Sequence, residues 1–478
     1  MKPAHHRDNQ EDLPLVVALD GTLIHSDILL ESLMVFIRTR ILQLWRLPLW
    51  LCGGMSRFRH KLAAAVLVDP ACLPYDRVLL AQIITQRARG RLIVMAADCP
   101  RSVAERVASH LQLFDRVLAS EGAFASSASD TAGQLVLAYG EKGFDYVGNG
   151  RPAVPLWLSC RTAYCVVHEA FLLADGRATV PLGSARRGWA MSLLRAMRPR
   201  QWLKNLLVVV PMLSAHLLSA PTTSASALAF LVFCLCASSA YLLNDALDVH
   251  DDRQHPSKCA RPIAAGTLPL SVALQASALL ALAGLALAAA FDRLLLLTLA
   301  LYFVSTLCYS LYLKRLMMID IVTLALLYTM RVLGGSASSH IPASFWLLAF
   351  SFFIFLSLAL LKRHSELINM QRVGKEKTSG RGYLAADSTP IGVLGVNSGL
   401  LSVLVFMLYF NSPGIVTMYR YPLLLLVIVP LLMLGLGRLW LLSYRGQVNE
   451  DPVLFLTRDP ISLILVGACV LVTALASG

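Results

Sequence analysis

Four polar residues follow an apolar stretch, and their types and spacing suit metal chemistry. Asn244, Asp245, Asp248 and Asp252 form the pattern NDxxDxxxD within Tyr241 to Gly266 (YLLNDALDVHDDRQHPSKCARPIAAG). On a helix, offsets of three and four residues place the three Asp side chains on one face. Carboxylates so close together repel one another unless a cation offsets their charge. Mg²⁺ bound to a diphosphate is the natural cation, because its usual shell combines hard oxygen ligands with substrate phosphates. A solvated acidic loop would not require this periodicity.

Basic residues follow the acidic pattern directly. Arg253, Lys258 and Arg261 come within nine residues of Asp252. Cations beside carboxylates either bind phosphate oxygens of the same substrate or mark the membrane orientation of the loop, and we favour phosphate binding.

A second polar block, Tyr309 to Asp320 (YSLYLKRLMMID), contains Tyr309, Lys314 and Asp320. An Asp at the start of a membrane-spanning helix is costly unless it is paired or liganded. We therefore interpret Asp320 as a second-metal carboxylate or as one that supports the metal ligands. The acidic residues of both blocks, Asp245, Asp248, Asp252 and Asp320, are the predicted catalytic residues.

The elements that must carry these blocks are membrane helices. The chain of 478 residues is 56% hydrophobic and 15% charged, and its mean hydropathy is +0.63. After Lys204, nine apolar segments approach the roughly 20 residues that a spanning helix needs. They cover 205–221, 226–243, 269–290, 294–312, 319–336, 344–361, 391–410, 421–441 and 460–477.

The loop charges predict an orientation. An odd number of spans puts the carboxyl terminus opposite the amino-terminal part. Loops on the amino-terminal side carry many basic residues, such as Lys362 and Arg363, whereas the other loops carry little beyond Arg293 and Arg420. By the positive-inside rule, the amino terminus and the site face the cytoplasm, in accord with the polar opening Met1 to Glu11. Orientation and phosphate ligands explain the net charge of +13 better than nucleic acid does.

Residues 1–180 read as a separate cytosolic α/β domain, followed by a linker and interfacial segment at 181–200 and the membrane domain at 201–478. Short apolar strands (Leu15 to Leu19, Arg91 to Ala97, Phe144 to Val147, Ala163 to Val167) alternate with amphipathic stretches such as Ser102 to Leu113. Ile41 to Cys52 is too short to span, and it is either a core or cap helix or an interfacial helix. The ten cysteines include no CxxC pair, so neither a disulfide framework nor a zinc site is expected.

Leu15 to Leu23 (LVVALDGTL) resembles the first motif of the haloacid dehalogenase superfamily, in which a strand ends in DxDGT. The resemblance implies a Rossmann-like fold and a phosphatase ancestry. It puts Asp20 at the acid/base position and Ala18 at the nucleophile position, where a methyl group cannot form a phosphoenzyme. Asn149 stands where the family's closing motif has an acid, the strand before Asp98 ends in Ala96 and Ala97 instead of Ser or Thr, and no Lys occurs between 120 and 130. We expect an inactive pseudo-phosphatase.

Three strings together resemble the UbiA prenyltransferase superfamily, and most closely its decaprenyl-phosphate phosphoribosyltransferase branch. They are RPRQWLKN at Arg198 to Asn205, the acidic pattern with its RPIAAG ending, and YSxYLKRxxxxD. The resemblance implies nine transmembrane helices of an all-α domain in a bacterial inner membrane. It also implies Mg²⁺-dependent transfer of 5-phosphoribose from phosphoribosyl diphosphate to a polyprenyl phosphate, with the lipid tail on apolar helix faces.

In that branch Asp245, Asp248, Asp252 and Asn244 would hold Mg²⁺ on the leaving diphosphate. Phosphate charge would be balanced by a set of basic and phenolic side chains: Lys258, Arg261, Lys314, Lys204, Arg198 and Tyr309. Two rivals remain. A prenyltransferase would move a prenyl group from a prenyl diphosphate to an aromatic or quinone-precursor acceptor, but the second block lacks the usual DxxxD. A transporter or scaffold would spread its acids along the helices, whereas these cluster at one edge.

Overall fold

The computed structural model describes residues 13–120, 128–150, 153–166, 170–182, 188–374, 382–410, 419–448 and 451–477. The chain divides into two compact units. The first comprises Met1–Met197 and Tyr241–Ala276, and the second comprises Arg198–Ala240 and Ser277–Gly478. The first unit therefore contains residues 241–266, called the acidic segment below, which the sequence predicts to lie in the domain 201–478. The predicted boundaries at 180 and 200 stay predictions.

The first unit is built on a parallel sheet of six strands in the order β3-β2-β1-β4-β5-β6. Strand β1 lies between β2 and β4. Its residues are all apolar, as expected for a parallel strand whose two faces are both covered. All four predicted strands are confirmed, whereas β3 and β6 carry too weak an apolar signal to have been predicted. The strands are β1 (Leu15–Ala18), β2 (Ile93–Pro100), β3 (Arg116–Ser120), β4 (Asp145–Gly148), β5 (Ala163–Cys165) and β6 (Val180–Pro181).

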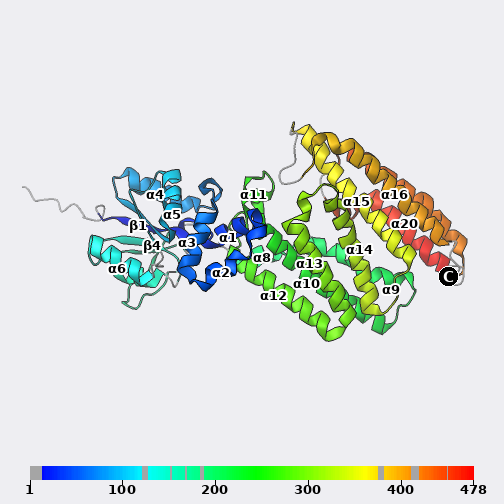
Figure 1. Cartoon of the computed structure of the whole chain (residues 1–478), viewed down its shortest axis with the longest axis horizontal. Coiled ribbons are helices and arrows are strands. Elements are labelled where there is room, and N and C mark those ends of the chain that lie inside the picture. The colour runs from blue at the N-terminus through cyan, green and yellow to red at the C-terminus, as the bar shows by residue number, and fades with distance from the viewer. Residues whose placement is uncertain are drawn as a thin grey trace, which may run out of the picture. The chain divides into compact units, whose positions relative to one another are not determined.

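Helices cover both faces of this sheet (Figure 1). On one face α4 (Arg77–Ala88) and α5 (Arg101–Leu111) pack on Leu15 and Val17, and on the other α6 (Ala128–Tyr139) and α7 (Val154–Ser159) pack on Val16 and Val94. Alternate residues of a strand point to opposite faces, which explains this division of β1. Helix α5 confirms the amphipathic stretch predicted at 102–113.

A helical subdomain follows β1. It contains the turn η1 (Leu19–Leu23), α1 (Ile28–Thr39), η2 (Ile41–Gln43), α2 (Arg46–Cys52), α3 (Met55–Ala65) and η3 (Pro70–Cys72). Leu44, Leu47 and Trp50 pack against the cluster around Phe36, while Trp45 and Leu49 are about 60% exposed. The segment 41–52 thus has a packed side, as a cap helix would, and an exposed apolar side. The unit also includes β6 and α8 (Trp189–Ala196), with residues 183–187 of the predicted linker outside the described part.

Eight helices are long and apolar enough to cross a membrane in the part of the chain that the structure describes. They are α10 (Ala220–Leu247), α12 (Leu270–Phe291), α13 (Arg293–Leu311), α14 (Ile319–Ser339), α15 (Phe345–Arg372), α16 (Ser388–Phe410), α18 (Ile428–Tyr444) and α20 (Pro460–Ser477), with η8 (Ala385–Asp387) and η9 (Pro422–Val427) extending the candidate spans of α16 and α18. Each coincides with a predicted apolar segment.

The remaining predicted span, 205–221, is not a helix of that length. The chain there forms the 3₁₀ helix η5 (Pro199–Val209) and the short α9 (Val210–Ser214). Pro211 removes a backbone donor, and His216 adopts a left-handed φ of 54°, which ends the helical run. The described residues therefore do not confirm nine helices, and the deduction from an odd number of spans stays a prediction.

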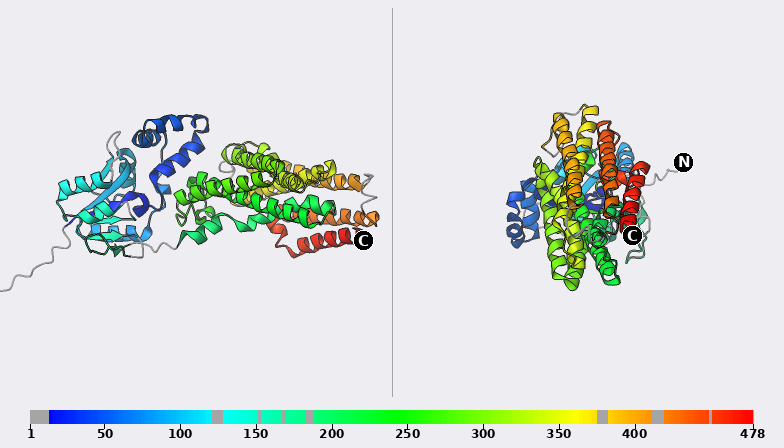
Figure 2. Two further views of the ribbon diagram at one scale, coloured as in Figure 1. Left: turned by 90° about the horizontal axis from the view of Figure 1, so that it is seen from below. Right: turned by 90° about the vertical axis from the view of Figure 1, so that its right-hand side faces the viewer.

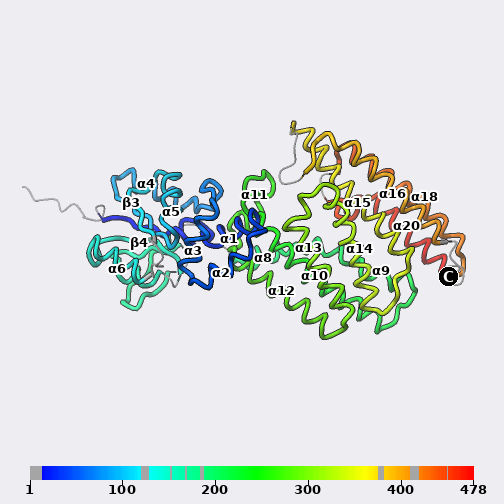
Figure 3. The backbone as a smooth tube through the Cα atoms, viewed as in Figure 1, coloured from blue at the N-terminus to red at the C-terminus, as the bar shows by residue number. Residues whose placement is uncertain are grey.

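The long helices of the second unit run side by side (Figure 2), and Figure 3 follows the chain through α14, α15, α16 and α18. Their core contains Ile321, Phe355, Leu361 and Trp440. Two short elements, η7 (Leu313–Arg315) and α19 (Pro452–Leu456), lie in the loops between them. Polar side chains on these helices and loops are buried in pairs, which is how a membrane bundle accommodates charge.

Candidate active site

The acidic segment is not one continuous helix. Helix α10 ends at Leu247, Asp248 has non-helical angles (φ −93°, ψ 7°), and α11 (Val249–Gln254) begins after it. The predicted single helix is therefore interrupted at Asp248, although helical hydrogen bonds from Asp248 N to Asn244 O and from Asp252 N to Asp248 O continue across the interruption. The three carboxylates form two groups that differ in their basic partner.

Asp245 and Asp252 form the first group, which converges on Arg261. The Nη1 atom of Arg261 lies 3.1 Å from Oδ1 of Asp245 and 2.6 Å from Oδ2 of Asp252. Both Asp residues are buried. Burial raises the pKa of Asp252, and the adjacent guanidinium of Arg261 opposes this shift. Lys258, in η6 (Lys258–Ala260), is close enough to act electrostatically on Asp252. The predicted residues Arg261 and Lys258 thus lie beside the predicted acids.

Asp248 belongs to the second group, with Asp251 and Arg38. Arg38 lies near the end of α1, and its Nη1 is 3.0 Å from Oδ1 of Asp248. Its Nη2 contacts Asp251, and its Nη1 also donates to the carbonyl of Leu247 at the end of α10, at 3.3 Å. A distant helix of the same unit therefore supplies the counter-ion. Asn244 lies half-buried just before this turn.

Arg253 is not arranged as a phosphate ligand. Its guanidinium donates to Glu31 at 2.8 and 3.1 Å, to the carbonyl of Cys72 at 2.9 Å and to the carbonyl of Ala264 at 3.1 Å. The guanidinium donors of Arg253 already have protein acceptors. We therefore no longer group Arg253 with Lys258 and Arg261 as a phosphate ligand.

The donor set around the acidic segment fits Mg²⁺ only together with a substrate. Among the described residues, no three His, Cys, Asp or Glu side chains gather closely enough to hold a metal ion. Mg²⁺ is commonly held by one or two carboxylates while substrate phosphates and water complete its shell. Asp245 and Asp252, which already share one cationic partner, and Asp248, which is partly exposed, could serve in this way.

In the second unit, Asp320 lies in a closed, buried arrangement. Arg363 Nη2 is 2.6 Å from Oδ2 of Asp320, and the hydroxyl of Tyr383 donates to Oδ1 at 2.6 Å. The same hydroxyl accepts the backbone N–H of Met318 at 2.8 Å. Asp320 is fully buried and Arg363 is 1% exposed. Both carboxylate oxygens thus have protein partners, which suits a structural ion pair better than a metal ligand.

Lys204 takes part in a second charged cluster of this unit, in which Lys204 and Asp451 are largely buried and Lys362 is 36% exposed. Its Nζ is 2.5 Å from Oδ2 of Asp451 and 5.5 Å from the centroid of the Tyr328 ring. Lys362 Nζ lies 3.5 Å from the same oxygen of Asp451. Although burial opposes it, the two ammonium groups lower the pKa of Asp451 to about 2. Two lysines around one carboxylate leave a local excess of positive charge.

The other predicted ligands are also in the second unit. Tyr309 is half-buried near the end of α13 and interacts electrostatically with Lys362, Arg363 and Asp320. Lys314 is half-buried in η7, and Arg198 is half-buried before η5 with a φ of 56°. From the sequence alone, Lys362 and Arg363 are interpreted only as loop charges, and Asp451 has no assigned role. Charged residues beside apolar segments need partners, and this rule could have marked them as members of charged clusters.

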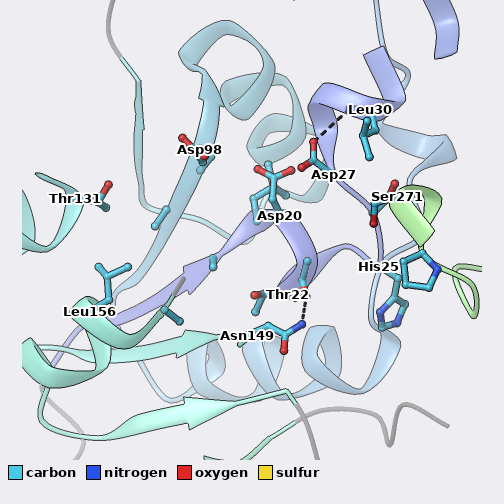
Figure 4. A pocket seen from close by; sticks show the side chains of 18 of the residues that line it. Asp20, Thr22, His25, Asp27, Leu30, Asp98, Thr131, Asn149, Leu156 and Ser271 are labelled. Carbon is cyan, nitrogen blue, oxygen red and sulfur yellow. Dashed lines mark hydrogen bonds between the residues drawn. The ribbon is translucent and has the colours of Figure 1, made fainter. Parts of the chain in front are cut away.

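The three residues predicted as a vestigial phosphatase site do come together. Ala18, Asp20 and Asn149 line a cavity of about 400 Å³ at the carboxyl ends of β1, β2 and β4 (Figure 4). The strand order reverses between β1 and β4, and such a point is where parallel sheets bind ligands. Burial and the neighbouring Asp27 raise the pKa of Asp20 to about 7. Asn149 donates to the carbonyl of Gly21 at 2.9 Å. Residues 121–127, where no Lys occurs, lie outside the described residues.

Comparison with known proteins adds a family. A model of the UbiA prenyltransferase family matches residues 208–458. A Sinorhizobium fredii protein named "Uncharacterized protein y4nM" is 31% identical over 457 residues, which are 94% of this chain and 88% of that protein. The decaprenyl-phosphate phosphoribosyltransferase of Mycolicibacterium smegmatis is 38% identical over 199 residues, which are 41% of this chain and 63% of that enzyme.

Among solved structures, a UbiA homolog from Archaeoglobus fulgidus bound to GPP and Mg²⁺ is 17% identical with a TM-score of 0.45 and covers 59% of this chain and 99% of its own. The family match extends over more than half of the chain, and eight apolar helices accompany it. The chain is therefore a multi-pass membrane protein and belongs to the UbiA prenyltransferase family.

Proposed function

We propose that this protein is a Mg²⁺-dependent transferase that moves 5-phosphoribose from phosphoribosyl diphosphate to a polyprenyl phosphate. The observation that carries this proposal over ordinary prenyl transfer is the closed state of Asp320. The second acidic motif of prenyltransferases holds metal on a prenyl diphosphate, and here its one remaining acid is bound to Arg363 and Tyr383. The named phosphoribosyltransferase relative supports the same choice.

The reaction balances without water. An oxygen of the polyprenyl phosphate forms a bond to C1 of the ribose, the bond from C1 to the diphosphate oxygen breaks, and diphosphate leaves with the electron pair. Bound Mg²⁺ would neutralise charge on the leaving diphosphate. Asp245, Asp248 and Asp252 would hold that ion, with Asn244 orienting the donor. Arg261 and Lys258, which already neighbour Asp252, would balance the phosphate charge as it grows.

Basic side chains of the second unit are further candidate phosphate ligands in this proposal. Lys204 and Lys362 both lie beside Asp451, and a phosphate could replace the carboxylate as their partner. Lys314, Tyr309 and Arg198 are further phosphate ligands in this proposal. The apolar surfaces of the long helices would take the polyprenyl tail and the surrounding membrane lipid.

The proposed setting is a bacterial inner membrane, with the amino-terminal domain and the site on the cytoplasmic side. The support is the excess of basic residues in loops on that side. Phosphoribosyl diphosphate is a water-soluble anion, so the acidic segment must face the compartment that contains it.

The head domain, defined as residues 13–182 of the first unit, is proposed to be a haloacid-dehalogenase-like pseudo-phosphatase. Ala18, Ala96 and Ala97 line its cavity, at the positions where that superfamily has a nucleophile and a phosphate-binding hydroxyl. Among the described lining residues none is Lys or Arg, while Asp20, Asp27 and Asp98 are all acidic. A phosphate ester would meet repulsion there. A purified head-containing protein is expected not to hydrolyse p-nitrophenyl phosphate; hydrolysis that Asp20→Asn abolishes would refute the proposal.

The transferase proposal is tested by turnover in detergent. Purified protein is incubated with Mg²⁺, a polyprenyl phosphate and phosphoribosyl diphosphate labelled in the ribose, beside an Asp248→Ala variant. Labelled lipid that retains its 5-phosphate is expected from the wild type and not from the variant. If no such lipid forms, but a prenyl diphosphate is consumed with an aromatic acceptor, the prenyltransferase alternative replaces the proposal.

A further inference from the structure

Helix α1 of the head domain contacts the acidic segment through two side chains of opposite charge. Glu31 and Arg38 are seven residues apart, which places them two turns apart on the same face of α1. Glu31 contacts basic residues of the acidic segment, and Arg38 contacts its acids. All of these residues belong to the first unit.

Glu31 forms the buried contact. It is fully buried and accepts two hydrogen bonds from Arg253, at 2.8 and 3.1 Å, and one from Ser26 at 2.5 Å. His250 Nε2 lies 3.1 Å from the same carboxylate. Although burial opposes it, His250 and Arg253 lower the pKa of Glu31 to about 2. An isosteric loss of this charge would leave Arg253 without its main counter-ion, which is costly for a side chain that is only 9% exposed.

Arg253 connects two parts of the acidic segment, α11 and the chain after Arg261. It belongs to α11, directly after Asp252, and it donates to the carbonyl of Ala264, beyond Arg261. It also donates to the carbonyl of Cys72 in the head domain. One guanidinium therefore fixes α11, the return of the chain after Arg261, and the head domain together.

Arg38 forms the more exposed contact. It is 19% exposed, and its partners Asp248 and Asp251 are 18% and 50% exposed. Such a pair exchanges partners more readily than a buried one, because water can solvate both groups on separation. When a cation takes Asp248, Arg38 keeps its contact with Asp251.

We propose that α1 is a positioning element for the transferase site: Glu31 anchors the acidic segment through Arg253, and Arg38 holds Asp248 until a metal-bound diphosphate takes its place. This inference rests on the proposed function for the role of Asp248. It gives the head domain a task that needs no phosphatase chemistry. The contact between Glu31 and Arg253 itself does not depend on which donor the enzyme uses.

The first test is hydrogen–deuterium exchange of the full-length protein in detergent, comparing wild type with Glu31→Gln. Amides of 249–268 are expected to exchange about tenfold faster in the variant. The matched control is Asp145→Asn, which removes the charge of another buried acid that pairs with two arginines, Arg91 and Arg161, in the same domain. This control is expected to leave exchange in 249–268 unchanged at a temperature where both variants are folded.

A second readout is the rise in melting temperature on adding Mg²⁺ with inorganic pyrophosphate. It is expected to be smaller in Glu31→Gln than in Asp145→Asn. If Glu31→Gln does not fold, Glu31→Asp keeps the charge on a shorter side chain and should give intermediate exchange. Unchanged exchange in 249–268, or the same increase in both variants, would overturn the inference. Neither readout requires sugar transfer, so failure of the proposed function would be seen separately, as lack of labelled lipid.

Discussion

The carboxylates of the acidic segment and the carboxylate of Asp320 differ in how their charge is balanced. Asp248 shares Arg38 with Asp251 at a partly exposed position, and Asp245 shares Arg261 with Asp252. Asp320 pairs with Arg363, which also contacts Glu366, and accepts a hydrogen bond from Tyr383. What distinguishes this pair is burial: Arg363 is 1% exposed, whereas Arg38 is 19% and Arg261 is 27% exposed. Accessible counter-ions can be exchanged for a metal, whereas a fully buried pair stabilises the fold. Under the proposed function, the same residue type would therefore serve chemistry in one region and architecture in the other.

Among variants that test this difference between the acidic segment and Asp320, we expect the largest change in activity from Asp252→Asn. Loss of a carboxylate that carries the metal-bound diphosphate should lower kcat/KM for phosphoribosyl diphosphate on the order of 10³-fold. Asp251→Asn is the matched control, because Asp251 is half exposed on the adjacent position, and it should stay within about threefold of wild type. Steady-state turnover measures both. An equal loss of kcat/KM in Asp252→Asn and Asp251→Asn would contradict the assignment of Asp252, and not Asp251, as a metal ligand.

Asp320→Asn should act on stability. Breaking a buried ion pair costs about 3–5 kcal/mol, because the buried Arg363 would keep its charge with only the more exposed Glu366 as counter-ion. Asp459→Asn, which affects the less buried pair with Arg438, should cost about 1 kcal/mol. Thermal unfolding in detergent would compare the two. A stable Asp320→Asn protein that has lost only its Mg²⁺ dependence would contradict the architectural role.

The anchor of the acidic segment predicts a pH dependence. The pKa of Glu31 falls from 4.5 to about 2 on folding. Its contribution, about 3 kcal/mol, is therefore complete above pH 4.5 and disappears as the pH falls from about 4.5 through about 2. The difference in melting temperature between wild type and Glu31→Gln should narrow as the pH is lowered from 6 to 3. A difference that is constant over this range would show that the charge of Glu31 does not stabilise the fold.

The smallest expected effect concerns Arg38→Gln. Removing a cation from Asp248 should lower the Mg²⁺ concentration that gives half of the thermal stabilisation with pyrophosphate, by about fivefold, because one exposed pair contributes about 1 kcal/mol. Arg101→Gln, in an exposed pair with Glu105, should leave this concentration unchanged. A higher Mg²⁺ requirement in Arg38→Gln would mean that Arg38 does not compete with the metal.

Much of the fold followed from local sequence signals. An apolar run of spanning length, or a buried β-branched strand such as Leu15–Ala18, is visible within its own residues. Eight predicted spans and four predicted strands are confirmed for this reason. The segment 205–221 failed because hydrophobicity does not register how Pro211 and the turn at His216 interrupt a helix.

Local sequence signals could not predict which site residues pair with one another, because the partners are far apart in the sequence. Glu31 and Arg253 are 222 residues apart, and Asp320 and Arg363 are 43 apart. The acidic pattern brings Asp245 and Asp252 together at Arg261, but it could not show that Arg38, on a helix far away in sequence, pairs with Asp248. One signal for Glu31 was present: an acid within the apolar stretch ILLESLMVF must find a partner if it is buried.

The most direct test of the proposed transfer is release of diphosphate from phosphoribosyl diphosphate, measured with and without polyprenyl phosphate. A phosphoribosyltransferase of the proposed kind should release diphosphate only when Mg²⁺ and the polyprenyl phosphate are both present, with one labelled lipid formed for each diphosphate. Diphosphate release that ignores the lipid, or no release while prenyl diphosphate is consumed, would contradict the proposal.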